Sequence, residues 1–248
     1  MLKRLMDIVC SALGLLLISP VLLPVMFLVW QYDKHSPFYV ASRVGRDGHP
    51  FKMVKMRSMV MNADKSGVSS TASTDKRITP VGHFIRRYKI DELTQLWNVL
   101  IGDMSLIGPR PQIQAGVDAY TLLERDLLLI KPGISDFASI VFSDEGRILE
   151  DQTDPDIAYN QLIRPGKSLL SLLYIKNQSV WLDIKLCFLT VTATLSREKA
   201  LAGVQEILQD IKAPDDVLWL AQRKQALVPR PPPGGDFIVT SRDGNPFV

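Results

Sequence analysis

The sequence is poor in the residues that build metal clusters, redox centres and hydrolytic triads. Its 248 residues include only two cysteines, Cys10 and Cys187, and neither has the spacing of a metal or redox motif. The three histidines, His35, His49 and His83, stand in basic or turn-rich segments. We interpret the cysteines as small buried hydrophobic residues and the histidines as solvated or hydrogen-bonded. A Cys/His metal cluster and a Ser-His-Asp triad therefore have little support.

The sequence also lacks an excess of charge of either sign. Its 29 lysines and arginines and 26 acidic residues leave a formal net charge of +3. A charge this small makes no case for a nucleic-acid partner. The hydrophobic fraction of 46% and the charged fraction of 22% are ordinary for a folded protein, and the length suffices for one domain with a substantial core.

The apolar residues crowd into the first thirty positions. Residues 8–30 contain no charged side chain, and a helix of this length can cross a bilayer. A cleavable signal peptide would have a shorter apolar region followed by a small-residue cleavage site, which this run does not contain. Two interpretations remain from the residues alone: a spanning anchor, and a re-entrant helix that dips into the bilayer and returns.

Two features of this run bear on that choice. Ser19 and Pro20 stand at its middle and Pro24 follows one turn later, so a bend is expected where the prolines remove backbone donors. Basic residues precede the run, at Lys3 and Arg4, and several more follow it. Charges on both sides conflict with a clean positive-inside assignment for a spanning helix. The residues alone leave the two interpretations evenly balanced.

After this run the pattern predicts a mainly helical body with a small β element. Residues 45–48 predict a hairpin turn between two short apolar segments. Residues 91–100 have the i, i+3, i+4, i+7 spacing of an amphipathic helix, which Gly102 ends. Residues 180–189 predict another amphipathic helix, which either packs on the core or lies in a membrane interface.

The main candidates for catalytic residues are the adjacent acids Asp91 and Glu92. They open the predicted helix shortly after Arg86, Arg87 and Lys89. Taken alone, acids in a first helical turn are well explained by capping and by the helix dipole. The surrounding cations argue for more than capping.

Further cations stand at Lys55 and Arg57 and at Arg110, which lies between Pro109 and Pro111. An arginine fixed between two prolines has less entropy to lose when it binds a phosphate.

Several long segments carry a family resemblance. In order, these are Ser19-Pro20 and residues 43–51 (RVGRDGHPF), 55–59 (KMRSM), 91–100 (DELTQLWNVL), 102–111 (GDMSLIGPRP) and 131–134 (KPGI). Together they resemble the motifs of the monotopic polyprenyl-phosphate phosphoglycosyl transferases, a family of bacterial sugar transferases, from residue 1 to about residue 195.

The resemblance implies a fold and a function. The fold is mainly α with a small β element: a re-entrant membrane helix (residues 1–32) broken at Ser19 and Pro20, and a cytoplasmic helical catalytic domain (33–196) with interfacial amphipathic helices. A C-terminal helical extension with a Pro-rich tail (197–248) follows. The reaction moves a sugar-1-phosphate from a UDP-sugar to undecaprenyl phosphate, releases UMP, and initiates surface glycan assembly at the inner membrane.

The resemblance also implies Mg²⁺ and a set of site residues. Asp91 and Glu92 are the expected catalytic and metal-binding acids. The expected substrate-binding cations are Lys55, Arg57, Arg86, Arg87, Arg110 and Arg147. Two departures from the family pattern stand out. Lys89 occupies a position that is often Ser or Thr, and Gly146-Arg147 comes later than usual, which weakens the assignment of Arg147.

An aspartate is ionised at neutral pH and can attack phosphorus, so we hypothesise a covalent phospho-sugar intermediate on Asp91. Direct transfer without an intermediate is the mechanistic rival. A non-catalytic membrane scaffold and a nucleotide-sugar hydrolase are the functional alternatives. The donor sugar stays open. So does the role of the segment after Arg197, which could pack on the body, bind a partner or form a homo-oligomer contact.

Overall fold

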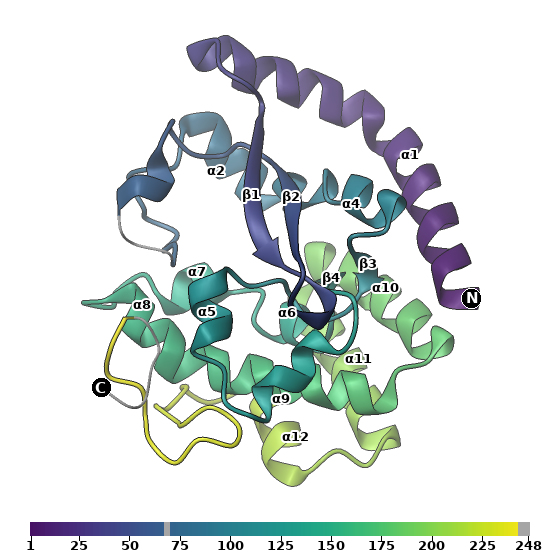
Figure 1. Ribbon diagram of the computed structural model, residues 1–248, viewed down its shortest axis with the longest axis vertical. Helices are drawn as coiled ribbons and strands as arrows, with labels where there is room; N and C mark the ends of the chain where they lie inside the picture. The colour runs from purple at the N-terminus through teal and green to yellow at the C-terminus, as the bar shows by residue number, and fades with distance from the viewer. Residues whose placement is uncertain (67–69, 243–248) are drawn as a thin grey trace.

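The computed structural model describes residues 1–66 and 70–242, so the last six residues of the predicted extension lie outside the described part of the chain. Helices predominate and strands are few, as predicted (Figure 1). The elements, in chain order, are α1 (Leu2–Asp33), β1 (Phe38–Val44), η1 (Arg46–Gly48), β2 (Pro50–Met56), η2 (Ala63–Ser66), α2 (Pro80–Arg87), α3 (Ile90–Leu93), α4 (Leu96–Ile101), β3 (Ser105–Ile107), α5 (Gln114–Asp118), η3 (Glu124–Leu128), β4 (Gly133–Ser135), α6 (Phe137–Val141), α7 (Glu145–Ile148), α8 (Pro155–Ala158), η4 (Tyr159–Ile163), α9 (Arg164–Asn177), α10 (Val180–Leu195), α11 (Arg197–Asp210) and α12 (Asp215–Gln222).

The β element is an antiparallel hairpin of β1 and β2, in which Phe38 pairs with Met56 and Val44 with Pro50. Its turn contains Asp47 and Gly48 with φ angles of 57° and 79°. These are left-handed conformations, which glycine adopts freely and aspartate tolerates. The hairpin turn predicted at residues 45–48 is therefore confirmed.

The main core is helical and lies between α6, α9, α10, α11 and α12. Phe137, Leu170, Leu186, Val204 and Leu208 are each 0% exposed within it. Since α11 and α12 supply part of this core, packing continues across residue 196, where the catalytic domain was predicted to end. The domain boundaries themselves stay predictions.

α10 has two apolar faces. Leu182 and Leu186 are buried in the core, whereas Trp181, Phe188 and Leu195 are 66%, 72% and 86% exposed. One face of the predicted amphipathic helix therefore packs on the core, and the other is free to meet an apolar surrounding.

α1 is a single helix of 32 residues that runs along the outer edge of the molecule (Figure 1). Within the described residues it alone is long and apolar enough to cross a bilayer, with a mean hydropathy of 2.5. The predicted break at Ser19 and Pro20 is not present, because the backbone stays helical through both prolines. Pro20 cannot donate to the Leu16 carbonyl, and the Ser19 hydroxyl donates to it instead over 2.8 Å.

The N-terminal end of α1 is fixed to the body by charged side chains. Lys3 Nζ lies 2.7 Å from Asp183 Oδ2, and the Arg4 guanidinium donates to the Val99 and Leu100 carbonyls over 2.5 and 2.8 Å.

One turn later, the buried Asp7 accepts hydrogen bonds from the Ser105 hydroxyl (3.1 Å) and the Leu106 amide (3.0 Å). The contacts of Lys3, Arg4 and Asp7 together join the start of α1 to α10, α4 and β3.

The C-terminal end of α1 is fixed to the same body. Asp33 forms a two-pronged ion pair with Arg57, with N–O distances of 2.5 and 2.6 Å. Earlier in α1, three apolar side chains are buried in one cluster with three from the body. The cluster consists of Leu22, Val25 and Val29 from α1 and Met56, Ile85 and Ile90 from the body. Both ends of the apolar helix therefore dock on one folded domain, and its remaining surface is left to apolar side chains.

Candidate active site

The acid pair lies on α3, a single helical turn held against the hairpin. Lys89, with a φ angle of 53°, turns the chain sharply between α2 and α3. Thr94 donates to the Val54 carbonyl over 3.1 Å. Asn98 accepts from the Val54 amide and donates to the Lys52 carbonyl. The polar residues of the motif that follows the acids therefore fix α3 and α4 to β2.

Glu92 is the centre of a network of ion pairs. Its Oε1 atom lies 2.6 Å from Arg110 Nη2 and 3.9 Å from Lys55 Nζ. Lys55 comes from β2, and both Lys55 and Glu92 are largely buried. Three residues that lie far apart in the sequence thus meet beside Asp91.

The two acids differ in their electrostatics. Burial raises the pKa of Asp91 above the ordinary value, and the negative charge of Glu92 raises it further. Burial also acts to raise the pKa of Glu92, but Arg110 and Lys55 outweigh it and hold that pKa well below the usual range. Glu92 is therefore an ionised partner of the cations at neutral pH, while Asp91 carries a charge that the protein alone balances incompletely.

The cations crowd one another. Burial lowers the pKa of Lys55 to about 8, and the charge of Arg110 adds to this. Burial lowers the pKa of Arg43, on β1, and Arg110 again adds to the effect. Arg86, on α2, is close enough to Asp91 for its charge to lower the aspartate pKa. Such a concentration of positive charge suits a polyanionic ligand.

Arg110 is held in place by two interlocked loops. The Gly133 amide donates to the Pro109 carbonyl over 2.8 Å, and the Gly108 amide donates to the Ser135 carbonyl over 2.9 Å. A Cβ atom on Gly133 would lie 2.1 Å from the Gly108 nitrogen, so the approach requires glycine. The Gly-Pro-Arg-Pro and Lys-Pro-Gly motifs are thus two halves of one support.

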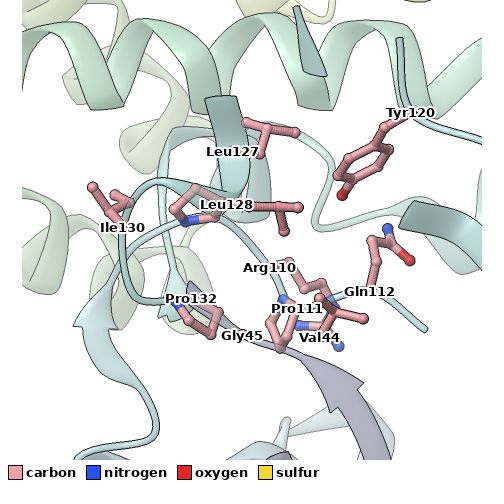
Figure 2. A pocket seen from close by; sticks show the side chains of 11 residues that line it. Val44, Gly45, Arg110, Pro111, Gln112, Tyr120, Leu127, Leu128, Ile130 and Pro132 are labelled. Carbon is pink, nitrogen blue, oxygen red and sulfur yellow. The ribbon is translucent and has the colours of Figure 1, made fainter. Parts of the chain in front are cut away.

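Beside Arg110 lies a shallow hollow (Figure 2). Tyr120 and Gln112 line one side of it, and Leu127, Leu128 and Ile130 line another part.

A second acid and base lie near enough to the same arginine to affect its pKa. Glu145 on α7 pairs closely with Lys167 on α9, and the charge of Glu92, with a smaller effect of Glu145, raises the pKa of Arg110.

Not every predicted cation joins the network. Arg57 is buried and committed to Asp33 and to the Ser36 carbonyl, so its contacts show a structural role in fixing α1. Arg87 is exposed and lies 5.7 Å from the ring centroid of Tyr88. Arg147 is also exposed, and its neighbour on α7, Glu145, faces the site in its place.

Sequence reasoning missed Arg43, Glu145 and Lys167. Arg43 stood inside a motif but was given no role of its own. Glu145 lies in the segment that departs from the family pattern, and Lys167 follows the sequence Arg164-Pro165-Gly166 at the start of a helix. No spacing rule links these positions, so only the fold could bring them together.

The two acids supply too few ligand groups for a metal ion unless a phosphate ligand binds as well. Within the described residues no cluster of three or more Asp, Glu, His or Cys side chains could hold a metal ion. Asp91 and Glu92 supply two carboxylates, and Mg²⁺ commonly binds through one or two carboxylates together with substrate phosphates. The incompletely balanced charge of Asp91 also fits a bound cation. The residues present are therefore compatible with Mg²⁺ in the presence of a phosphate ligand.

Comparison with known proteins gives named relatives. A UDP-glucose:undecaprenyl-phosphate glucose-1-phosphate transferase of Klebsiella pneumoniae is 39% identical over 193 residues, which are 76% of this chain and 39% of that protein. A UDP-galactose-lipid carrier transferase of Erwinia amylovora is 35% identical over 215 residues, 80% of this chain and 41% of that protein.

A UDP-N-acetylgalactosamine-undecaprenyl-phosphate N-acetylgalactosaminephosphotransferase of Aeromonas hydrophila is 34% identical over 200 residues, 78% of this chain and 44% of that protein. The chain thus spans less than half the length of each of these relatives. A family model described as bacterial sugar transferase matches residues 1–197, the region that holds α1, the hairpin and every site residue above. The chain therefore belongs to the bacterial sugar transferase family.

Proposed function

We propose that the protein is a phosphoglycosyl transferase that moves a sugar-1-phosphate from a UDP-sugar to undecaprenyl phosphate, giving UMP and a polyprenyl diphosphate-linked sugar. The observation that carries the proposal is Asp91, a carboxylate beside Lys55, Arg110 and the paired Glu92. The names of the relatives support the same class of donor and acceptor. In this role the protein initiates the assembly of a surface glycan.

The proposed chemistry has two displacement steps. An Asp91 oxygen attacks the sugar-bearing phosphorus, and the bond from that phosphorus to the bridging oxygen breaks, so UMP leaves with the electron pair. An oxygen of the lipid phosphate then attacks the same phosphorus, and the bond to Asp91 breaks. Lys55 and Arg110 are positioned to balance the charge of the donor phosphates in both steps.

Asp91 and Glu92 would hold Mg²⁺ together with the donor phosphates. When bound, the ion supplies positive charge that lets an anionic carboxylate approach an anionic diphosphate. Glu92 also fixes the Arg110 guanidinium at 2.6 Å, so it orients a phosphate-binding group as well as a metal. The two acids lie on adjacent positions of one turn and need not perform one task.

We further propose that α1 is re-entrant, with both ends at the cytoplasmic face of the inner membrane. A straight helix of 32 residues is about 48 Å long, against about 30 Å for the bilayer core. Its two ends nonetheless contact one folded domain, through Lys3 and Asp7 at one end and Asp33 at the other. A spanning helix would leave these ends on opposite sides.

The helical course of α1 suits an apolar surrounding at Pro20. The proline frees the Leu16 carbonyl, and the Ser19 hydroxyl donates to it. No bare carbonyl is therefore left at Leu16 in the apolar phase, where an unsatisfied group costs several kcal/mol.

The position of α1 also explains how the acceptor could reach the acids. Ile90, which directly precedes Asp91, packs against Leu22, Val25 and Val29 of this helix. A prenyl chain could remain in the lipid while its phosphate enters the basic cluster.

The function is tested by UMP release from detergent-solubilised protein with Mg²⁺ and a panel of UDP-sugars, with and without undecaprenyl phosphate. We expect lipid-dependent release from one donor. Release that ignores the lipid would favour a hydrolase. Tight binding of a donor without any release would favour a non-catalytic scaffold.

Asp91 and Glu92 differ in a way that mutation can separate. Asp91→Asn should lower turnover by more than about a thousandfold, because it removes the nucleophile, yet leave the thermal melting temperature unchanged or raised, because ionised Asp91 is disfavoured in the fold. Glu92→Gln should lower the stability at neutral pH by about 1–3 kcal/mol, because Arg110 and Lys55 lose an ionised partner.

The stability difference between the wild type and Glu92→Gln should shrink as the pH falls, since a depressed carboxyl pKa stabilises the fold only while the group is ionised. Thermal melts and UMP release on the same preparations measure both effects. Substantial turnover by Asp91→Asn would contradict the assignment of the nucleophile.

The pH profile of kcat/KM for the donor should have two limbs. On the alkaline side it should fall above about pH 8, because Lys55 loses its charge there. On the acid side it should fall at a higher pH than an ordinary aspartate would cause, because the pKa of Asp91 is raised. In Lys55→Arg the guanidinium stays charged, so the alkaline limb should disappear and the acid limb should stay. An unchanged alkaline limb in this variant would exclude Lys55 as its origin.

A further inference from the structure

Glu145 and Lys167 form an acid–base pair in the site that the chemistry above does not use. Lys167 Nζ contacts Glu145 Oε2, and it lies 5.6 Å from the ring centroid of Tyr159. The Tyr159 hydroxyl accepts a hydrogen bond from Gln112 over 3.1 Å, and Gln112 lines the hollow beside Arg110 (Figure 2). The pair is thus continuous with the phosphate-binding cluster.

The pair adds no net positive charge to the site. Burial acts to raise the pKa of Glu145, but Lys167 outweighs it and holds that pKa below the ordinary value, and the charges of Arg110 and Lys89 add to this effect. The ionised carboxylate cancels the charge of Lys167, so the pair does not increase the attraction for a diphosphate. A neutral pair of this kind suits a part of the ligand that carries hydrogen-bonding groups and no negative charge.

The pair also differs from a purely structural ion pair of the same protein. Glu124 and Arg164 are almost completely buried, and both Glu124 oxygens are occupied, by Arg164, Ser168 and the Thr121 amide. The Glu145 side chain is 33% exposed. Within the described residues its Oε1 atom accepts no hydrogen bond. One carboxylate oxygen and the remaining ammonium protons are thus free for a ligand.

We propose that Glu145 and Lys167 bind the sugar ring of the donor through two adjacent free hydroxyls. The inference rests on the proposed transferase function and deepens it. Glu145 accepts a hydrogen bond from one hydroxyl, and Lys167 donates to the other. The Tyr159 ring lies beside Lys167, and its hydroxyl accepts from the Gln112 amide. The donor class is therefore a UDP-hexose or UDP-hexosamine with an unmodified vicinal diol.

The test compares each donor with its deoxy analogues. Among UDP-glucose, UDP-galactose and UDP-N-acetylgalactosamine, the donor with the highest kcat/KM serves as the parent, beside its 3-deoxy and 4-deoxy forms. The protein variants are Glu145→Gln, Lys167→Met and, as a matched control, Arg242→Met, which removes an exposed ion pair with Asp154. Melting temperatures are measured on all variants, and Glu145→Gln preserves the shape of the side chain.

In the wild type we expect at least one deoxy form to lose about 10- to 100-fold in kcat/KM, the effect of a hydrogen bond to a charged group. In Glu145→Gln and Lys167→Met the parent should fall by a similar factor, and the penalty for the deoxy form should shrink to less than about threefold. The control should retain the wild-type penalty.

Three results would overturn the inference. Wild-type protein could accept parent and deoxy donors equally. The variants could lower both donors by one common factor, which is the result of a structural role. The wild type could instead release UMP only from a UDP-2,4-diacetamido-2,4,6-trideoxyhexose, which has no vicinal diol. In each case UMP release that depends on undecaprenyl phosphate would still support the transferase. Absence of release from every donor would overturn the function itself.

Discussion

The attachment of both ends of α1 to one folded domain is the constraint on which the rest of the structure depends. Lys3, Arg4 and Asp7 bind the body at one end, and Asp33 binds Arg57 at the other. Many of the apolar side chains between them are exposed, so this part of the helix suits a lipid surrounding. Ile90 packs on the same helix and directly precedes Asp91 in the chain, so Asp91 lies next to the surface on which α1 docks. The catalytic centre that we propose is therefore fixed at an interface by the fold itself.

Charge balance gives the site its second organising feature. Lys55 and Arg110 gather around a single well-paired acid, Glu92, and Arg43 lies near both of these cations. Asp91 stays poorly compensated. Such an arrangement costs stability in the free protein, and under our proposal a ligand that brings both phosphates and a cation relieves this cost. Beyond Arg110 the chemistry changes to a paired acid and base with a phenol and an amide, which suits hydroxyl groups. Under our proposals the site has one region for phosphate and one for a neutral ring.

The sequence predicted the elements that depend on local chemistry. The hairpin turn at residues 45–48 follows from its glycines, and Gly102, with a φ angle of 102°, ends α4 as expected. Asp91, Glu92, Lys55 and Arg110 lie in long motifs, and the fold brings them together. Arg57 and Glu145 show what the sequence could not predict. Whether an arginine meets a phosphate or an aspartate, and whether a glutamate on a one-turn helix faces a site, depends on contacts between distant segments. The helical course of α1 through Ser19 and Pro20 was likewise not predicted, and there the Ser19 hydroxyl donates to the carbonyl that Pro20 leaves without a donor.

The most direct test is the sidedness of the two ends of α1. In a background with Cys10→Ser and Cys187→Ser, single cysteines at the exposed positions Leu2 and His35 would be labelled with a membrane-impermeant maleimide. The comparison is between spheroplasts, which expose the periplasmic face, and inverted inner-membrane vesicles, which expose the cytoplasmic face. If both ends dock on one cytoplasmic domain, both cysteines react in the vesicles and neither reacts in the spheroplasts. Labelling of one cysteine from each side would show a spanning helix and contradict the docked arrangement.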